Sequence, residues 1–341
     1  MNRAAWLVVA VTGLAAPPLF ADEASDLRQQ LEAQKAINAQ LRQRIDALER
    51  AAAGLPPPAL AAPAPRAPAS EVESEATTTA IEEALVAKGL VLLPAGSFRI
   101  APGFAWQHTG ADALSTRSDT YTASVSAQAG LPFGLMASAY VPYLHRRTSI
   151  GSNSGAGDFS LGLARALVDE TARTPALIAS VNYLHDSGED AFGDVALGSG
   201  FRYAAVGLSA LKRADPLALF GSLAYTHGFS RRVVADALFD AATFSGRIEP
   251  GDAWNWRLGV SLAATPEITL DASLSGAFVD GAEVQPDGGE HFTLARSTVA
   301  LVNMGAGFIL GRKVSLLVSA AAGVTDDAPD FVFSASLPYR F

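Results

Sequence analysis

The sequence predicts an all-β membrane barrel of about twelve antiparallel strands, and three observations support this fold class. The final stretch, 329–341, places an apolar or aromatic side chain at every second position and ends on Phe341. From Ser97 onward the chain keeps a period of two, which is the period of side chains along a strand. Every second connection in that region is short, as in barrels with short turns at one end and long loops at the other.

Composition limits the classes of protein to which the chain can belong. The 341 residues include no cysteine, which excludes a disulfide framework, a haem-attachment motif and any thiolate metal site. A net charge of −9 argues against a nucleic-acid partner, because neutralising phosphates requires a basic surface. Residues 1–21 have the pattern of a secretory signal peptide, with Arg3 before an apolar stretch. Beyond them no segment approaches roughly 20 consecutive apolar residues, so membrane residence requires strands.

Residues 22–52 have the heptad pattern of a coiled coil, which we place in the periplasm. Arg44 and Glu49 match a three-stranded pattern, in which the arginine packs over the core and pairs with a glutamate of the next helix. The sequence therefore favours a homotrimer. A dimer stays open, because a buried asparagine such as Asn38 often specifies two strands. The residues that we assign to the trimer coil are Leu27, Leu31, Leu41, Arg44, Ile45, Leu48 and Glu49.

A linker and a second helix separate the coil from the barrel. Residues 53–70 are rich in proline and alanine and predict a semi-rigid extended spacer. Residues 71–93 begin with an amphipathic helix, whose apolar stripe includes Ile81, Ala84 and Leu85. This stripe is too narrow to span a membrane but sufficient to dock, so we predict a helix that plugs the barrel at 94–341.

We place the twelve strands from the period of two and the turn signals. Twelve is an even number, as expected for a bacterial barrel, and the connection at 230–251 is the longest. The predicted ranges are 97–108, 118–130, 134–146, 157–167, 176–186, 198–211, 217–229, 252–263, 268–279, 291–310, 314–324 and 329–341.

The inner face of the predicted barrel is mostly small and polar, which leaves room for water. Five charged residues are assigned to this face, namely Arg99, Arg202, Arg257, Asp119 and Asp271. They would form either an ion-pair web that braces the wall or a charge-selective filter. The acidic side of the plug helix is expected to meet one of the three arginines. A barrel of about twelve strands encloses a narrow lumen, wide enough for small solutes or an unfolded chain.

A motif of an aromatic residue followed two positions later by histidine ends four of the strands, at Trp106–His108, Tyr143–His145, Tyr183–His185 and Tyr225–His227. We place both members on the lipid face, with the rings as an aromatic girdle and the imidazoles among the head groups. Outward groups on alternate strands lie too far apart to share one metal ion. An interfacial lipid hydrolase that pairs one histidine with a serine has no supporting motif. We therefore assign no catalytic, metal or cofactor residue.

Several stretches resemble known outer-membrane transporters. Residues 84–96, followed by a strand with Pro102 and Trp106, resemble the start of the barrel in functional-amyloid export channels of the outer membrane (Fap-type). Residues 131–135, 140–143 and 155–160 resemble the wider outer-membrane transporter family named for the meta-pathway of phenol degradation.

In the amyloid exporters a trimeric coiled coil, a linker, a plug helix and a twelve-stranded barrel follow in the order predicted here. The resemblance covers the whole mature chain. It also implies that the outer-membrane assembly machinery reads the last strand, with Tyr339 and Phe341.

These observations together predict a gated channel in the bacterial outer membrane, with its N-terminal region in the periplasm, that exports an unfolded polypeptide such as amyloid subunits. The alternative is an uptake channel for small, aromatic or hydrophobic solutes. The expected partners are outer-membrane lipids and lipopolysaccharide, the assembly machinery, a polypeptide cargo and further copies of the chain. No nucleic acid and no cofactor is expected.

Overall fold

The computed structural model describes residues 82, 84–86, 88–110, 117–236 and 243–341. The predicted signal peptide, coiled coil and linker lie outside the described residues, as does Ile81 of the plug helix. Residues 82 and 84–86 are helical, and a 3-10 turn, η1, spans Pro132–Gly134. None of the helices in the described ranges is long and apolar enough to cross a membrane.

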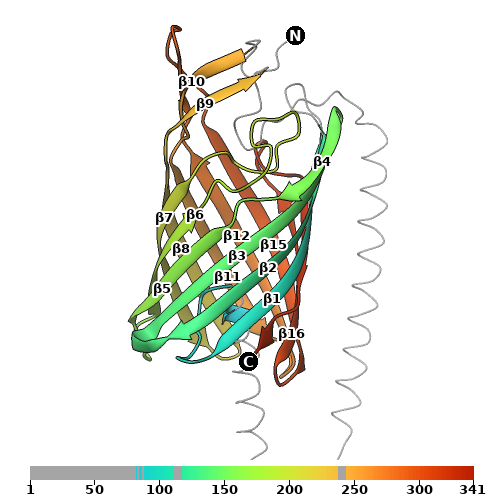
Figure 1. Cartoon of the computed structure of the whole chain (residues 1–341). Coiled ribbons are helices and arrows are strands. Elements are labelled where there is room, and N and C mark those ends of the chain that lie inside the picture. Colours follow the sequence, from blue (N-terminus) through green and yellow to red (C-terminus); the bar gives the residue numbers. More distant parts are fainter. Residues whose placement is uncertain (1–81, 83, 87, 111–116, 237–242) are drawn as a thin grey trace, which may run out of the picture. The chain divides into compact units, whose positions relative to one another are not determined.

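The other regular elements of the described chain are all β-strands (Figure 1). Its strands are β1 (Phe98–Thr109), β2 (Ser118–Leu131), β3 (Leu135–Thr148), β4 (Gly151–Ala156), β5 (Ser160–Val168), β6 (Ala176–Leu184), β7 (Tyr203–Ala214), β8 (Leu217–Gly228), β9 (Arg231–Asp236), β10 (Thr243–Glu249), β11 (Ala253–Ala263), β12 (Ile268–Val279), β13 (Glu283–Pro286), β14 (Phe292–Thr293), β15 (Ser297–Gly311), β16 (Val314–Gly323), β17 (Phe331–Ser336) and β18 (Tyr339–Arg340).

The large sheet has 14 strands and closes on itself, because β1 pairs with β17 and β15 pairs with β16. These strands fill twelve positions in the wall, since β4 and β5 both pair with β3, and β17 and β18 both pair with β1. All neighbours are antiparallel. The predicted closed barrel of twelve strands is therefore confirmed.

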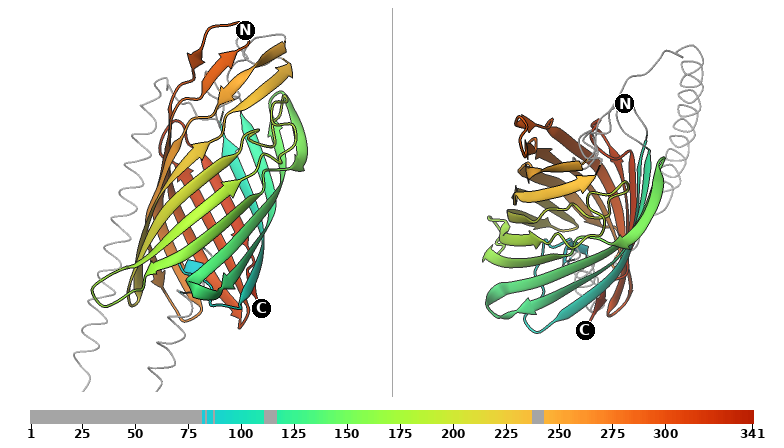
Figure 2. Two further views of the ribbon diagram at one scale, coloured as in Figure 1. Left: turned by 60° about the vertical axis from the view of Figure 1, so that its left-hand side comes forward. Right: turned by 45° about the horizontal axis from the view of Figure 1, so that its top comes forward.

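The two ends of the barrel differ as predicted. We call the end with the connections at 132–134, 169–175, 215–216, 264–267 and 312–313 the short-turn end, and the opposite end the loop end. At the loop end, β14, β13, β10 and β9 form a separate sheet, which projects beyond the barrel strands (Figure 2). Its core joins Val233, Phe244, Ile248 and Val284 to Phe201. The predicted long loop at 230–251 thus contains β9 and β10.

Two predicted strands begin at least five residues later than expected. β7 starts at Tyr203 rather than at 198, because Gly200 has a φ of +73° and the Ser199 hydroxyl donates to the carbonyl oxygen of Phe201 at 2.9 Å. β15 starts at Ser297 rather than at 291, because 292–293 pair with β13 in the loop-end sheet.

The alternation of side chains separates an outer from an inner face. Large apolar side chains exposed on the outer face form a band around the barrel, as lipid contact requires. The band includes Phe104, Val125, Val141, Tyr143, Leu161, Leu163, Val181, Val206, Leu208, Leu219, Leu223, Leu258, Leu270, Leu274, Phe278, Val302 and Met304. The inner face carries mainly serine, asparagine and glycine in the middle of the strands, as predicted.

Candidate functional site

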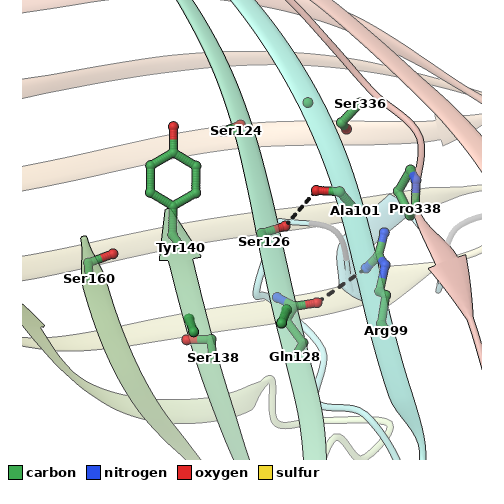
Figure 3. A pocket seen from close by; sticks show the side chains of 13 residues that line it. Arg99, Ala101, Ser124, Ser126, Gln128, Ser138, Tyr140, Ser160, Ser336 and Pro338 are labelled. Carbon is green, nitrogen blue, oxygen red and sulfur yellow. Dashed lines mark hydrogen bonds between the residues drawn. The ribbon is translucent and has the colours of Figure 1, made fainter. Parts of the chain in front are cut away.

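A polar cavity of about 350 Å³ lies against the inner wall of β1, β2 and β3 (Figure 3). Its lining includes serines from four strands, at 124, 126, 138, 160 and 336, and the ring of Tyr140. The Ser126 hydroxyl donates to the carbonyl oxygen of Ala101 at 3.4 Å. Such small polar side chains leave space for water or for the polar part of a solute.

The chain before β1 reaches the inner face of the barrel at the short-turn end. We call residues 82, 84–86 and 88–97 the lumen segment; Figure 1 draws it in blue to cyan. Backbone hydrogen bonds fix its last residues to β2, because the Gly96 N–H donates to Gly130 O and the Gly130 N–H donates to Ser97 O, both at 2.9 Å.

Apolar side chains of the lumen segment pack against inner-face residues on opposite sides of this end. Leu85 is 0% exposed and forms one buried cluster with Leu90. On the barrel side that cluster contains Leu211, Ala218, Phe220 and Ala263. A second cluster joins Val86 and Leu93 to Met136. Burial of these side chains favours the docked arrangement by about 1.5–3 kcal/mol for each large one.

Ion pairs connect the same segment to the wall. Lys88 Nζ lies 2.8 Å from Asp271 Oδ1, and both side chains are largely buried. Burial lowers the pKa of Lys88, and the hydrogen bond with Asp271 partly offsets this effect. Glu82 lies 2.6 Å from Arg213, which also contacts Glu170 at 2.8 Å. Burial alone would raise the pKa of Glu170. The hydrogen bonds from Arg213 together lower it by more, so the net shift of this pKa is downward.

Two inner-face glycines lie against the lumen segment, and one of them is required for its close approach. A Cβ atom at Gly130 would lie 2.0 Å from the carbonyl oxygen of Pro94, which is a backbone atom with little room to move. A Cβ atom at Gly307 would lie 3.8 Å from the Cβ of Ala84. The close approach of backbone to β2 therefore requires glycine at position 130.

Three of the five charged residues assigned to the inner face lie there. Arg99 is 3% exposed and donates to Gln128 at 3.5 Å. Arg257 pairs in register with Ser275, and Asp271 pairs with Gly305, both on the inner face. Of the plug-helix residues, Ala84 is 4% and Leu85 0% exposed.

The assignments of Asp119 and Arg202 to the lumen are wrong. Asp119 lies opposite His108 on the outer face, where it accepts hydrogen bonds from the His108 ring at 2.8 Å and from Trp106 at 3.3 Å. Its parity matches that of Tyr121 on the same strand, so alternation alone could have placed it. Arg202 precedes β7 in a loop, with its side chain 53% exposed and 4.0 Å from Asp186.

One acid of the predicted plug helix, Glu82, lies among the described residues, and it meets Arg213. The other acids, at 71, 73, 75 and 83, lie outside the described residues, so the expected contact with Arg99, Arg202 or Arg257 stays a prediction. The sequence analysis missed Arg213, Leu211, Phe220 and Met136, which contact the lumen segment. A signal was present, because these large or charged residues stand at inner-face positions next to short turns, where the pattern elsewhere gives small polar ones.

The histidine motif lies at the loop end. His108 and His227 each place Nδ1 2.8 Å from an aspartate oxygen, of Asp119 and Asp252 respectively. His145 Nδ1 lies 2.6 Å from the Ser154 hydroxyl. Within the described ranges, none of the hydrogen bonds joins His145 to a carboxylate, which a serine hydrolase would need. Among the described residues no cluster of three or more His, Asp or Glu could hold a metal ion.

The C-terminal residues complete the wall beside β1. The Phe341 N–H donates to Phe98 O at 2.8 Å, and the two rings lie 5.8 Å apart. Tyr339 pairs with Ile100 and stacks edge-on against Phe341 at 4.7 Å. Both aromatic side chains are exposed on the outer face.

The molecule has the fold of outer-membrane β-barrels, and comparison with solved structures agrees. The chain is similar to the COG4313 outer membrane channel from Pseudomonas putida F1, with 15% identity, a TM-score of 0.61 and coverage of 74% of this chain and 97% of that chain. At this identity the likeness concerns the fold alone.

Weaker similarity extends to the translocator domain of the autotransporter NalP from Neisseria meningitidis, with 12% identity, a TM-score of 0.42 and coverage of 80% and 98% of the two chains. The transport unit of the autotransporter AIDA-I from Escherichia coli has 11% identity and a TM-score of 0.44, with coverage of 78% of this chain and 99% of that chain. These scores are too low to support an argument. No protein-family profile matches the chain.

Proposed function

We propose that this protein is a gated channel of the bacterial outer membrane, in which the lumen segment closes the short-turn end. The observation that carries the proposal is the complete burial of Leu85 among inner-face side chains. The outer apolar band suits residence in a bilayer, and the polar inner wall suits an aqueous path. The short-turn end then faces the periplasm, where the N-terminal region lies.

The transported molecule is, in this proposal, an unfolded polypeptide such as amyloid subunits. The order of predicted parts supports this choice, because a trimeric coil before the barrel would hold cargo or partner chains near the channel mouth. A narrow lumen lined by small polar residues accepts an extended chain without large apolar contacts. Release of the lumen segment would clear the path.

Uptake of small solutes is the second candidate, and the cavity beside β1 to β3 favours it. Its volume of about 350 Å³ matches a small molecule, and Tyr140 offers a ring against which an aromatic solute could stack. The two candidates share the gate and differ in cargo. Liposome swelling with small aromatic solutes, compared with current block by an unfolded polypeptide, distinguishes them.

No enzymatic activity is proposed. A liposome assay for phospholipid release tests this directly, because a hydrolase built on His145 and Ser154 would liberate fatty acid. Activity that disappears in Ser154→Ala would replace the channel proposal with an enzyme.

The gate is tested by conductance in planar bilayers. We expect the full-length protein to be mostly closed and a variant that lacks residues 22–90 to give larger and steadier conductance. A variant that lacks 22–52 alone is the matched control, because it removes the predicted coil and keeps the lumen segment. Equal conductance of the full-length protein and the longer deletion would reduce the proposal to a simple pore.

A further inference from the structure

The outer faces of β1, β2 and β3 form three ordered rows at the loop end. Backbone register places Phe104, Ala123 and Tyr143 in one row. The next row toward the loops holds Trp106, Tyr121 and His145. The last row holds His108, Asp119 and Arg147. From the first row to the third, toward the loops, the surface therefore changes from apolar to amphipathic to charged.

Contacts between these side chains make the surface a preformed site. Asp119 holds the His108 ring at 2.8 Å and the Trp106 indole at 3.3 Å. The rings of Tyr121 and His145 lie 6.1 Å apart, and the Ser154 hydroxyl holds the His145 ring at 2.6 Å. Each imidazole uses Nδ1 in these contacts, so Nε2 is left for another partner. Side chains fixed in this way lose little conformational entropy when they bind a ligand.

The charge of this surface favours an anion. Arg147 stands in the outermost row, and Arg117 lies just before β2; both are exposed. Two arginines therefore stand near the carboxylate of Asp119, which already accepts from His108 and Trp106, and near that of Asp330, which accepts from the Gly110 N–H at 2.6 Å. Arginine side chains are strong donors to phosphate oxygens, and an imidazole N–H can donate as well.

The corresponding surface on the other side of the barrel is more acidic. There the motif of Tyr225 and His227 meets Asp252 and, beyond β12, Asp280. One arginine, Arg296, lies beside Asp280 at 3.0 Å. The same aromatic girdle thus continues around the barrel, but there the carboxylates outnumber the arginines.

We propose that the loop-end outer surface of β1, β2 and β3 binds the phosphate group of an outer-leaflet lipid. The phosphate lies between Arg147, His108 and His145, and the apolar part of the lipid lies along Trp106 and Tyr143. This inference rests on the proposed location in the outer membrane. A lipid is favoured over free phosphate, because only a lipid also covers the two aromatic rows next to the charged one.

Binding of lipid A to the full-length protein in detergent micelles tests the proposal. The probes are diphosphorylated lipid A, the same lipid without its phosphates, and inorganic phosphate, each followed by native mass spectrometry. We expect diphosphorylated lipid A to bind and Arg147→Gln to weaken binding about tenfold, as loss of one charge-assisted hydrogen bond implies. Arg147→Lys keeps the charge and should restore part of the affinity. Arg296→Gln is the matched control and should bind as the unaltered protein does.

Three results would overturn the proposal. Equal binding of the dephosphorylated lipid would show that only the apolar rows bind. Displacement of lipid A by inorganic phosphate at equal concentration would indicate a free-phosphate site. The Arg147→Gln variant should still migrate differently before and after boiling, as a folded barrel does. If this folded variant binds lipid A with unchanged affinity, the surface is excluded. The test needs no conductance measurement, so its failure is separate from failure of the gate.

Discussion

Substitution of Leu85 should open the channel, and the magnitude of this effect can be worked out from the packing of the Leu85 side chain. The Leu85 side chain is 0% exposed and lies among Leu211, Ala218, Phe220 and Ala263. Leu→Ala at such a site costs about 2–5 kcal/mol. If the loss falls on docking of the lumen segment, the ratio of docked to undocked molecules falls at least about 25-fold. Leu85→Asp should act more strongly, since an unpaired buried carboxylate disfavours docking further.

Single-channel recording in planar bilayers measures this ratio as the fraction of time spent open. Leu258→Ala is the matched control, because Leu258 is 63% exposed on the outer face of β11 and should leave gating unchanged. The boiled and unboiled migration of each variant reports whether the barrel is folded. Folded Leu85→Asp channels that stay as closed as the unaltered protein would refute the reasoning.

Four further predictions follow from individual contacts and segments. Gly130→Ala should open the channel, because its Cβ would meet the Pro94 carbonyl oxygen at 2.0 Å; an unchanged open fraction would argue against this contact. Despite burial, hydrogen bonds from Arg213 hold the pKa of Glu170 below its usual 4.5, so its contribution to barrel stability is complete above that pH and is lost as the pH falls through the folded value; thermal unfolding in detergent should show this loss, less so in Glu170→Gln. Removal of Phe341 should lower the amount of barrel in the membrane fraction, and normal insertion would contradict the role of the last residue. A peptide of residues 22–52 should sediment as a trimer that Arg44→Ala weakens; a trimer indifferent to this change would remove the reason for choosing three chains.

Alternation and turn signals predicted the barrel because they are local. Side chains such as Phe331, Phe333 and Tyr339 repeat at every second position, and lipid contact on one face imposes that repeat on every strand. The same parity placed Arg257 and Asp271 on the inner wall. The same parity places Asp119 with Tyr121 on the outer face, opposite His108.

The contacts of the lumen segment could not be predicted in the same way. The pairing of Glu82 with Arg213 joins residues that are 131 positions apart, and the pairing of Lys88 with Asp271 is of the same kind. No sequence period relates such partners. The loop-end sheet also depends on long-range pairing, because β10 pairs with β13, which lies in a different connection between barrel strands. Local patterns give strands and faces, whereas closure of the lumen depends on long-range packing.

A cross-link between the lumen segment and the wall tests the gate most directly. Leu85 and Leu211 share one buried cluster, and the chain has no cysteine of its own, so Leu85→Cys with Leu211→Cys gives a defined pair. Joined by a disulfide or a short reducible linker, the pair should hold the channel closed, and reduction should restore openings in the same bilayer. Conductance through the cross-linked protein equal to that of the reduced protein would contradict a gate formed by this segment.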